Sequence, residues 1–332
     1  MSLAPRRGFQ YESKISFGAG LRRAGGSTLL VARAGSNPLG SGVDEKVSQL
    51  IELALSEDIG SGDVTSQYFV SEQREGQAFL VARSEGVVAG VKIGAEVFRR
   101  VDPACEVTVM LQDGSSVFPG VQILEVSGKA QSLLTAERTA INFVQRLSGV
   151  ATRTSKFVKA VEGTGVTIMD TRKTTPGWRL LEKNAVVSGG GYNHRMGLYD
   201  RAMVKDNHLL VDGTSVDLKN SIQSMKKDHP EIAVELEADT LEQVEAFLGM
   251  NEVDYLLLDN MDNFTMKKAV SMRGDRKRPV LEASGGVSLE TVRGIAETGV
   301  DCISVGELTH SAVALDLALD FVPDRKSTRL NS

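Results

Sequence analysis

The chain has 332 residues, of which 41% are hydrophobic and 24% charged, and its formal net charge is −5. This composition is ordinary for a globular enzyme with a substantial core, and its acidity argues against a protein whose main task is binding a nucleic-acid backbone. Cys105 and Cys302 lie far apart and no apolar run is long enough to span a bilayer, which argues against a disulfide framework, a CxxC metal site and a membrane span.

The two ends of the chain differ in composition from the middle. Residues 1–42 are basic, poor in acids and rich in serine, which predicts a targeting or disordered segment. A transit peptide would direct the protein to a plastid or mitochondrion, and without one we expect a cytoplasmic location. Residues 324–332 read like a translated sequencing adapter, so we interpret them as an artefactual tail.

Residues 43–149 predict an α+β domain. Asp44 is expected to cap a helix whose apolar stripe covers residues 47–55. Strands separated by glycine turns are predicted at residues 78–83, 87–91, 106–111 and 121–126. A helix over residues 132–147, with Gly149 as its C-cap, completes this half.

Residues 150–323 predict an α/β barrel, because short apolar runs alternate with helical patterns. The expected strands are 166–169, 201–204, 232–236, 255–258, 280–282 and 302–305. Helices are expected to follow N-cap residues at Thr240 and Ser288.

Charged side chains follow the predicted strands, at the end where a parallel barrel builds its active site. The cations are Arg172, Lys173, His194, Arg195 and Lys205. Ion pairing with nearby acids is an alternative for any one of them, but it explains the whole group poorly. So many cations on an acidic protein indicate a polyanionic small molecule, and an arginine fork matches a carboxylate with two hydrogen bonds.

Carboxylates and glycines follow the later strands. Glu237 and Asp259 can hold Mg²⁺, bind sugar hydroxyls or stabilise a cationic sugar carbon, and pairing with the cations is the alternative. Residues 284–286, Ser-Gly-Gly, precede a predicted helix and, with Gly306, are typical of a phosphate site. The pattern predicts a site for a phosphorylated sugar, a metal and a small dicarboxylate.

Several long strings resemble the quinolinate phosphoribosyltransferase (nicotinate-nucleotide pyrophosphorylase, carboxylating) family. They are residues 60–65, 137–142, 147–149, 170–177, 188–198, 205–208, 258–260 and 282–286. The resemblance covers about residues 43–322. Trp178 stands where the family usually has Leu, a change that we expect to be tolerated beside the pocket.

The resemblance implies a fold, a reaction and an assembly. The fold is an N-terminal α+β domain joined to a seven-stranded open α/β barrel, which is TIM-like. The reaction joins quinolinate to the ribose of phosphoribosyl pyrophosphate with decarboxylation, giving nicotinate mononucleotide, pyrophosphate and CO₂ for NAD biosynthesis, with Mg²⁺ as cofactor. The assembly is a homodimer or a higher oligomer, with neither nucleic acid nor membrane as partner.

The resemblance also assigns roles to residues of this chain. Quinolinate would be bound by Arg172, Lys173, His194, Arg195 and Lys205, and by Arg138 donated across the dimer interface. Ribose and Mg²⁺ would be held by Glu237 and Asp259, directly or through the substrate, with Glu235 as an alternative to Glu237. The 5-phosphate would be bound by Ser284, Gly285, Gly286 and Gly306. The expected catalytic residues are Lys173, Glu237 and Asp259.

Three other functions stay open from the sequence. Lys205 permits a Schiff-base enzyme of the aldolase type, although four neighbouring cations argue against it. A non-catalytic protein that binds a pyridine or nucleotide is a second alternative, and a related barrel transferase that acts on nicotinate is a third. The pairing of Arg172 with Arg195 favours a substrate with two carboxylates over nicotinate.

Overall fold

The computed structural model describes residues 44–205, 208 and 218–323. The predicted targeting segment and the predicted artefactual tail lie outside these residues. Within them, no helix combines the length and the apolar character needed to cross a membrane.

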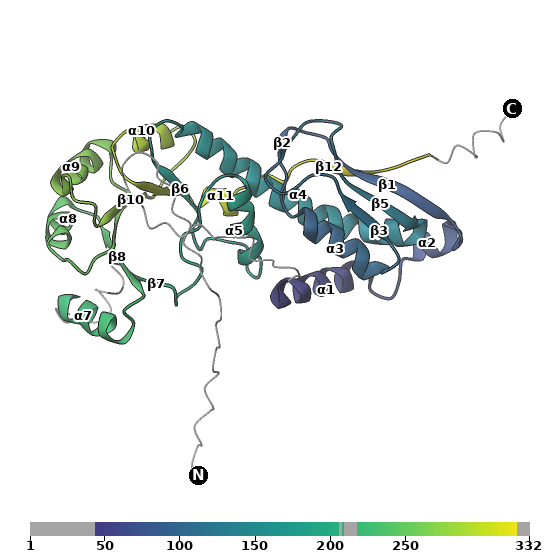
Figure 1. Ribbon diagram of the computed structural model, residues 1–332, viewed down its shortest axis with the longest axis horizontal. Coiled ribbons are helices and arrows are strands. Elements are labelled where there is room, and N and C mark those ends of the chain that lie inside the picture. Colours follow the sequence, from purple (N-terminus) through teal and green to yellow (C-terminus); the bar gives the residue numbers. More distant parts are fainter. Residues whose placement is uncertain (1–43, 206–207, 209–217, 324–332) are drawn as a thin grey trace, which may run out of the picture.

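The N-terminal half is an antiparallel sheet covered by helices, as predicted (Figure 1). Its strand order is β12-β1-β5-β3. The strands are β1 (Glu75–Ala82), β3 (Glu106–Val109), β5 (Gln122–Lys129) and β12 (Leu317–Phe321), and a separate ribbon pairs β2 (Gly86–Val87) with β4 (Ser116–Val117). The helices are α1 (Glu45–Ile59), α2 (Val64–Phe69), α3 (Val91–Val101) and α4 (Ala130–Ala160).

Two sequence predictions in this half are wrong. The strand expected at residues 87–91 is reduced to β2, and helix α3 begins at Val91. The chain turns there because Gly90 adopts a left-handed conformation (φ 79°) against the side chain of Leu147. Gly149 does not end a helix, since α4 continues to Ala160.

Gly149 instead allows a close crossing. A Cβ at this position would collide with the backbone carbonyl of Val313, so only glycine lets α4 pack directly on the segment before β12. Helix α4 packs against β1 and β5 in one half and against α5 and β6 in the other. The predicted domain boundary at residues 149–150 therefore falls inside a continuous helix, and β12 returns the chain to the first sheet.

The C-terminal half is a parallel sheet with the strand order β6-β11-β10-β9-β8-β7. Its strands are β6 (Thr167–Met169), β7 (Arg201–Val204), β8 (Ala233–Ala238), β9 (Tyr255–Asp259), β10 (Val280–Ser284) and β11 (Cys302–Ser304). The helices around it are α5 (Arg179–Ser188), α7 (Leu218–Asp228), α8 (Leu241–Leu248), α9 (Asn263–Arg273), α10 (Val292–Ala296) and α11 (Glu307–His310). The described sheet has six strands. Beside β6, Tyr192 forms an isolated parallel bridge with Met169.

The two predicted helix caps have different outcomes. Thr240 caps α8 in a capping box with Gln243, as expected. Ser288 does not cap a helix, because its carbonyl accepts the N–H groups of Thr291 and Val292 in a turn, and α10 begins only at Val292. The Ser-Gly-Gly segment is thus followed by a turn and not directly by a helix.

Alternation along the strands separates a core from a polar interior. On β9, Leu256 and Leu258 join the apolar core, whereas Tyr255 and Asp259 have the opposite parity. Glu235 and Glu237 on β8 share an orientation for the same reason, and neither belongs to the apolar core. The barrel interior therefore carries titratable side chains at two depths.

We predict that Gly149→Ala destabilises the protein by about 2–4 kcal/mol, because the added methyl group forces α4 away from the Val313 carbonyl. Urea unfolding followed by circular dichroism measures this change. The control is Lys156→Ala on an exposed position of the same helix, for which we expect less than about 0.5 kcal/mol. Equal stability of the two variants would contradict the close crossing.

Candidate active site

The predicted site residues gather at the carboxyl ends of the parallel strands. Arg172 and Lys173 follow β6, Lys205 follows β7, and Gly306 follows β11. The other strands contribute Glu237, Asp259, Ser284, Gly285 and Gly286 at the same ends. Since all six strands are parallel, these positions share one mouth of the barrel.

A buried ion pair fixes the loop that carries His194 and Arg195. Lys183 on α5 pairs with Asp170, and both side chains are almost fully buried. Asp170 also accepts the backbone N–H of His194 (2.9 Å) and the side-chain amide of Asn193 (2.7 Å). Burial raises the pKa of Asp170 and lowers that of Lys183, and the attraction within the pair opposes both shifts.

Arg172 and Arg195 form a cationic pocket. Arg195 donates to the carbonyl of Arg201 (3.1 Å), and within the described part of the chain neither Arg172 nor Arg195 forms an ion pair. The Nε atom of Arg172 is buried and has no hydrogen-bond partner among the described residues. Burial, and then the charge of Arg172, lower the pKa of Arg195. Two guanidinium groups held together in this way form a site for an anion.

His194 lies at the floor of this pocket. Its Nε2 atom is 3.3 Å from carboxylate oxygens of both Glu235 and Glu282, and its Nδ1 atom accepts the N–H of Arg195 (2.7 Å). Burial lowers the pKa of His194, but Glu282 and Glu235 outweigh that effect and raise the pKa to about 9. The raised pKa favours the positively charged ring, and the Arg195 N–H at Nδ1 opposes the second ring proton.

The ligand atoms of His194, Glu235 and Glu282 lie within 4.8 Å of one another, a spacing that suits a cation. Arg201 supplies that cation. Its Nη1 atom lies 3.1 Å from Glu235 and 3.3 Å from His194, and its guanidinium stacks over Tyr255 (4.0 Å). The charges of the floor are thus balanced by protein side chains.

Glu235 and Glu237 have distinct environments. Glu235 is fully buried and engaged with Arg201 and His194. Glu237, two residues closer to the mouth, pairs with Lys205, whose side chain is 40% exposed. Asp259 ends the neighbouring strand β9 and accepts a hydrogen bond from the side chain of Asn260 (2.7 Å). Of the carboxylates predicted from the sequence, Glu237 and Asp259 therefore stand at the mouth, and Glu235 lies below it.

The glycine segments form a wall of the mouth that adjoins Asp259 and Asn260. Gly285 has φ 92° and leaves no room for a side chain, because a Cβ there would collide with the Asn260 side chain. Gly306 lies against the side chain of Lys173, because a Cβ added at Gly306 would be 3.0 Å from the Cδ of Lys173. Thr309 donates to the carbonyl of Lys173 (2.8 Å) and so fixes Lys173 beside this wall. Backbone approach without side chains suits a phosphate group.

Several residues of the site were not assigned a role from the sequence. Asp170, Lys183 and Arg201 act through buried pairs, and Glu282 lies inside a matched string without a predicted function. Asp170 directly follows β6, which could have indicated it, whereas Lys183 lies on α5, Arg201 begins β7 and Glu282 lies inside β10. Arg138 is exposed on α4, and no contact in the described structure joins it to the barrel mouth.

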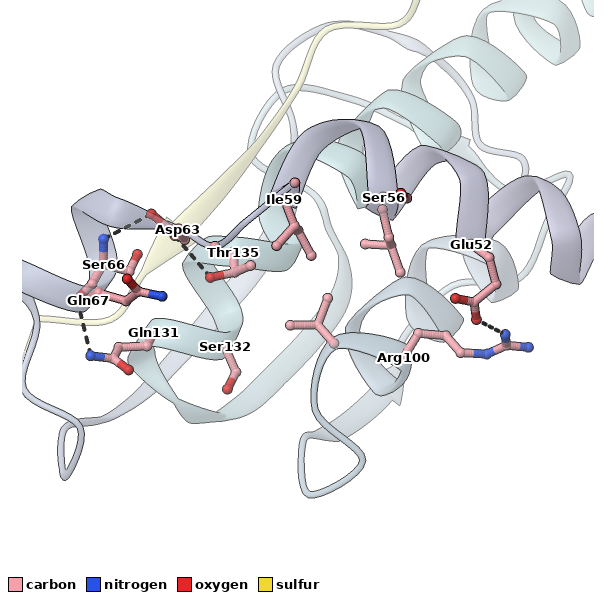
Figure 2. Close-up of a pocket in the computed structure, with 14 residues that line it drawn as sticks. Glu52, Ser56, Ile59, Asp63, Ser66, Gln67, Arg100, Gln131, Ser132 and Thr135 are labelled. Atoms are coloured by element: carbon pink, nitrogen blue, oxygen red, sulfur yellow. Dashed lines mark hydrogen bonds and ion pairs between the residues drawn. The ribbon is translucent and has the colours of Figure 1, made fainter.

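A separate pocket of about 530 Å³ lies in the N-terminal half (Figure 2). Its lining comes from α1, α2, α3 and α4 and from the connection between α1 and α2. Asp63 accepts hydrogen bonds from the Ser66 N–H (2.9 Å) and the Thr135 hydroxyl (2.9 Å), and Arg100 pairs with Glu52. The polar side chains of this pocket are largely engaged with one another, so it lacks the open cations of the barrel mouth.

Comparisons with known proteins agree with this geometry. Residues 63–148 match the quinolinate phosphoribosyl transferase N-terminal domain, and residues 150–320 match its C-terminal domain. The chain is 41% identical over 286 residues to a chloroplastic nicotinate-nucleotide pyrophosphorylase [carboxylating] of Arabidopsis thaliana, covering 81% of each chain. A Mycobacterium leprae protein of the same name is 43% identical and is covered to 95%, with 81% of this chain aligned. The solved nicotinate-nucleotide pyrophosphorylase of Francisella tularensis superposes with a TM-score of 0.79 at 35% identity, covering 86% of this chain and 99% of that one.

We predict that Gly285→Ala weakens binding of ribose 5-phosphate about tenfold, because the methyl group displaces Asn260 and strains the loop. Isothermal titration calorimetry measures the affinity. The matched variant is Gly286→Ala, where φ is 58° but no atom lies within 4 Å of the added Cβ. A larger loss in Gly286→Ala than in Gly285→Ala would show that the close contact with Asn260 is not what shapes this wall.

Proposed function

The chain belongs to the quinolinate phosphoribosyltransferase family, and from this premise we propose how its barrel mouth performs the reaction of that family. The protein is a pentosyltransferase that transfers the phosphoribosyl group of phosphoribosyl pyrophosphate to quinolinate with decarboxylation. The products are nicotinate mononucleotide, pyrophosphate and CO₂, in a step of NAD biosynthesis.

The observation that carries the proposal is the pair of Arg172 and Arg195, neither of which forms an ion pair in the described structure. Quinolinate has carboxylates on adjacent ring carbons, and two guanidinium groups without ion-pair partners in the described structure supply the matching charge. We assign Lys173, His194 and Lys205 to the same pocket. His194 contributes from the floor, where Glu235 and Glu282 orient its ring.

The ribose side of the site is assigned to Glu237 and Asp259. Carboxylate oxygens are the ligands that Mg²⁺ prefers, and both carboxylates stand at the mouth, so the residues present fit this ion directly or through the substrate. When bound, Mg²⁺ neutralises charge on the pyrophosphate leaving group. We place the 5-phosphate at Ser284, Gly285, Gly286 and Gly306.

The transfer step needs positioning rather than a nucleophilic residue. The pyridine nitrogen bonds to ribose C1 while the bond from C1 to the pyrophosphate oxygen breaks. We assign Glu237 and Asp259 to stabilising the positive charge that develops on the sugar, and Lys173, beside the glycine wall, to binding negative charge of phosphoribosyl pyrophosphate. The cations at the carboxylates hold the ring in line with C1.

Decarboxylation follows from the new charge on the ring. Ribosylation makes the ring nitrogen positive, which stabilises the electron pair left at C2 when the bond to its carboxylate breaks and CO₂ leaves. A proton then takes the place of CO₂ at C2. The remaining carboxylate of the product stays within reach of the cationic pocket.

The contacts of Lys205 argue against the alternative of a Schiff-base enzyme of the aldolase type. A Schiff-base lysine must present its amine to a carbonyl group, whereas the Lys205 side chain is engaged by the Glu237 carboxylate. The rival that uses nicotinate would leave one guanidinium of the Arg172–Arg195 pair without a carboxylate, at a cost in affinity.

We propose a homodimer in which Arg138 enters the partner's barrel mouth. Arg138 is exposed, and the neighbouring α2 exposes 80% of Tyr68 and 84% of Phe69, far more than large apolar side chains need to expose on a monomer. Other side chains of α2, with side chains of α1, α3 and α4, line the pocket of this half (Figure 2). A second copy covering α2 would bury the apolar side chains.

The first measurement is turnover. We expect the protein with phosphoribosyl pyrophosphate and Mg²⁺ to form nicotinate mononucleotide from quinolinate and not from nicotinate, measured by chromatography. Arg172→Met should raise the KM for quinolinate about a hundredfold, because it removes one carboxylate contact. Product from nicotinate alone would refute the two-carboxylate pocket.

The second measurement tests the donated arginine. Arg138→Ala and Lys173→Ala variants should each be inactive, and mixing them after subunit exchange should restore about a quarter of wild-type activity, since half of the dimers then hold one intact site. No recovery, with exchange confirmed by mass spectrometry, would place Arg138 in the site of its own chain.

A further inference from the structure

Helix α5 begins with an arginine, Arg179, that does not stabilise the helix. Arg179 is the first residue of α5, where the helix dipole disfavours a positive charge. No carboxylate pairs with it in the described structure. Its guanidinium instead donates to three oxygens that lie outside the helix.

Those three oxygens belong to the two loops that carry the cationic pocket. Arg179 donates to the backbone carbonyl of Arg172 (3.3 Å) and to the hydroxyl of Thr174 (3.0 Å) on the loop after β6. It also donates to the backbone carbonyl of Met196 (3.1 Å), the residue after Arg195. One rigid guanidinium thus joins the residue Arg172 to the immediate neighbour of Arg195.

The second loop is fixed from its other side as well. The N–H groups of Met196 and Gly197 donate to Asp200 at 2.6 and 2.9 Å, so the Met196 carbonyl has a defined direction. Asp200 holds the N–H of Met196, and Arg179 holds the carbonyl of Met196. These two backbone contacts fix the position of the preceding residue, Arg195. The same is true of Arg172, whose carbonyl also accepts the N–H of Thr174 (2.9 Å).

We propose that Arg179 is a positioning residue that sets the separation of Arg172 and Arg195 and thereby selects a ligand with two adjacent carboxylates. Arg172 and Arg195 repel each other, so an empty pocket would widen without a tie between their loops. Arg179 provides that tie through two carbonyl oxygens and a hydroxyl, and it makes no contact with either pocket guanidinium group through these bonds. The inference rests on the proposed function, because the ligand is the quinolinate of that reaction.

The chain offers a matched control in Arg276. Its guanidinium also donates to three oxygens, the carbonyls of Leu248, Met272 and Arg273, each at 3.0 Å. These acceptors lie at the carboxyl ends of α8 and α9, which in a barrel of this kind are at the end opposite the active site. Removing either arginine therefore breaks a similar set of hydrogen bonds.

The test compares Arg179→Met, Arg179→Lys and Arg276→Met. Arg179→Met should raise the KM for quinolinate about tenfold while the KM for phosphoribosyl pyrophosphate stays within about twofold. Arg179→Lys, which cannot reach all three acceptors, should fall between it and the wild type. Arg276→Met should leave both KM values within about twofold.

Unreactive ligands measure the same effect without turnover. Calorimetry should show Arg179→Met losing about tenfold in affinity for phthalate, a benzene-1,2-dicarboxylate, but less than about threefold for benzoate. Equal losses for both ligands, or a common rise in both KM values, would overturn the proposal. A wild type without turnover would refute the proposed function, and the ratio of phthalate to benzoate binding would still decide the role of Arg179.

Discussion

Repulsion between like charges is the constraint on which the barrel mouth depends. Arg172 and Arg195 stand close enough for the charge of one to lower the pKa of the other, and within the described chain neither has a carboxylate partner. A pocket of this kind is unstable unless the backbone that carries it is held from outside. Helix α5 supplies that support, because Arg179 binds carbonyls of both loops and Lys183 fixes Asp170 beneath them.

The buried carboxylates of the barrel lie deeper than the guanidinium groups of Arg172 and Arg195. Glu235 and Glu282 lie at the floor, where both contact His194 and Glu235 binds Arg201, and neither forms an ion pair with Arg172 or Arg195 in the described structure. The period of two along each strand makes this separation possible, since residues two apart share a direction but differ in depth. Glu237 is thereby left at the mouth, where a carboxylate can act on the sugar.

The sequence predicted the parts of this structure that depend on local pattern. All six parallel strands were expected within a few residues, and the polar residues at their ends pointed to one mouth. What failed depended on contacts between distant segments. Gly149 is typical of a helix end, but it lies inside α4, where Val313 crosses it. The valine-rich segment before α3 has the composition of a strand, but the left-handed Gly90 ends it.

The supporting network was beyond prediction for a related reason. Arg179 and Glu182 lie on a helix, where charged residues are usually solvated. Their spacing in the sequence does not indicate which hydrogen-bond partners they contact. Glu182 is nevertheless fully buried, accepting hydrogen bonds from Arg146 on α4 and from both the N–H and hydroxyl of Thr175.

Arg146 extends this support to the glycine wall. It donates to the carbonyls of Ala312 and Thr309, and the hydroxyl of Thr309 holds the carbonyl of Lys173. Trp178 stands where the family usually has Leu. Its ring stacks on Phe143 of α4, the helix that also carries Arg146, with ring centroids 4.8 Å apart. The larger ring therefore adds to the contact between α4 and the loop before α5. Since α4 also carries Arg138, one helix links the wall, the cationic loops and the exposed arginine, and a shift of α4 would disturb all three together.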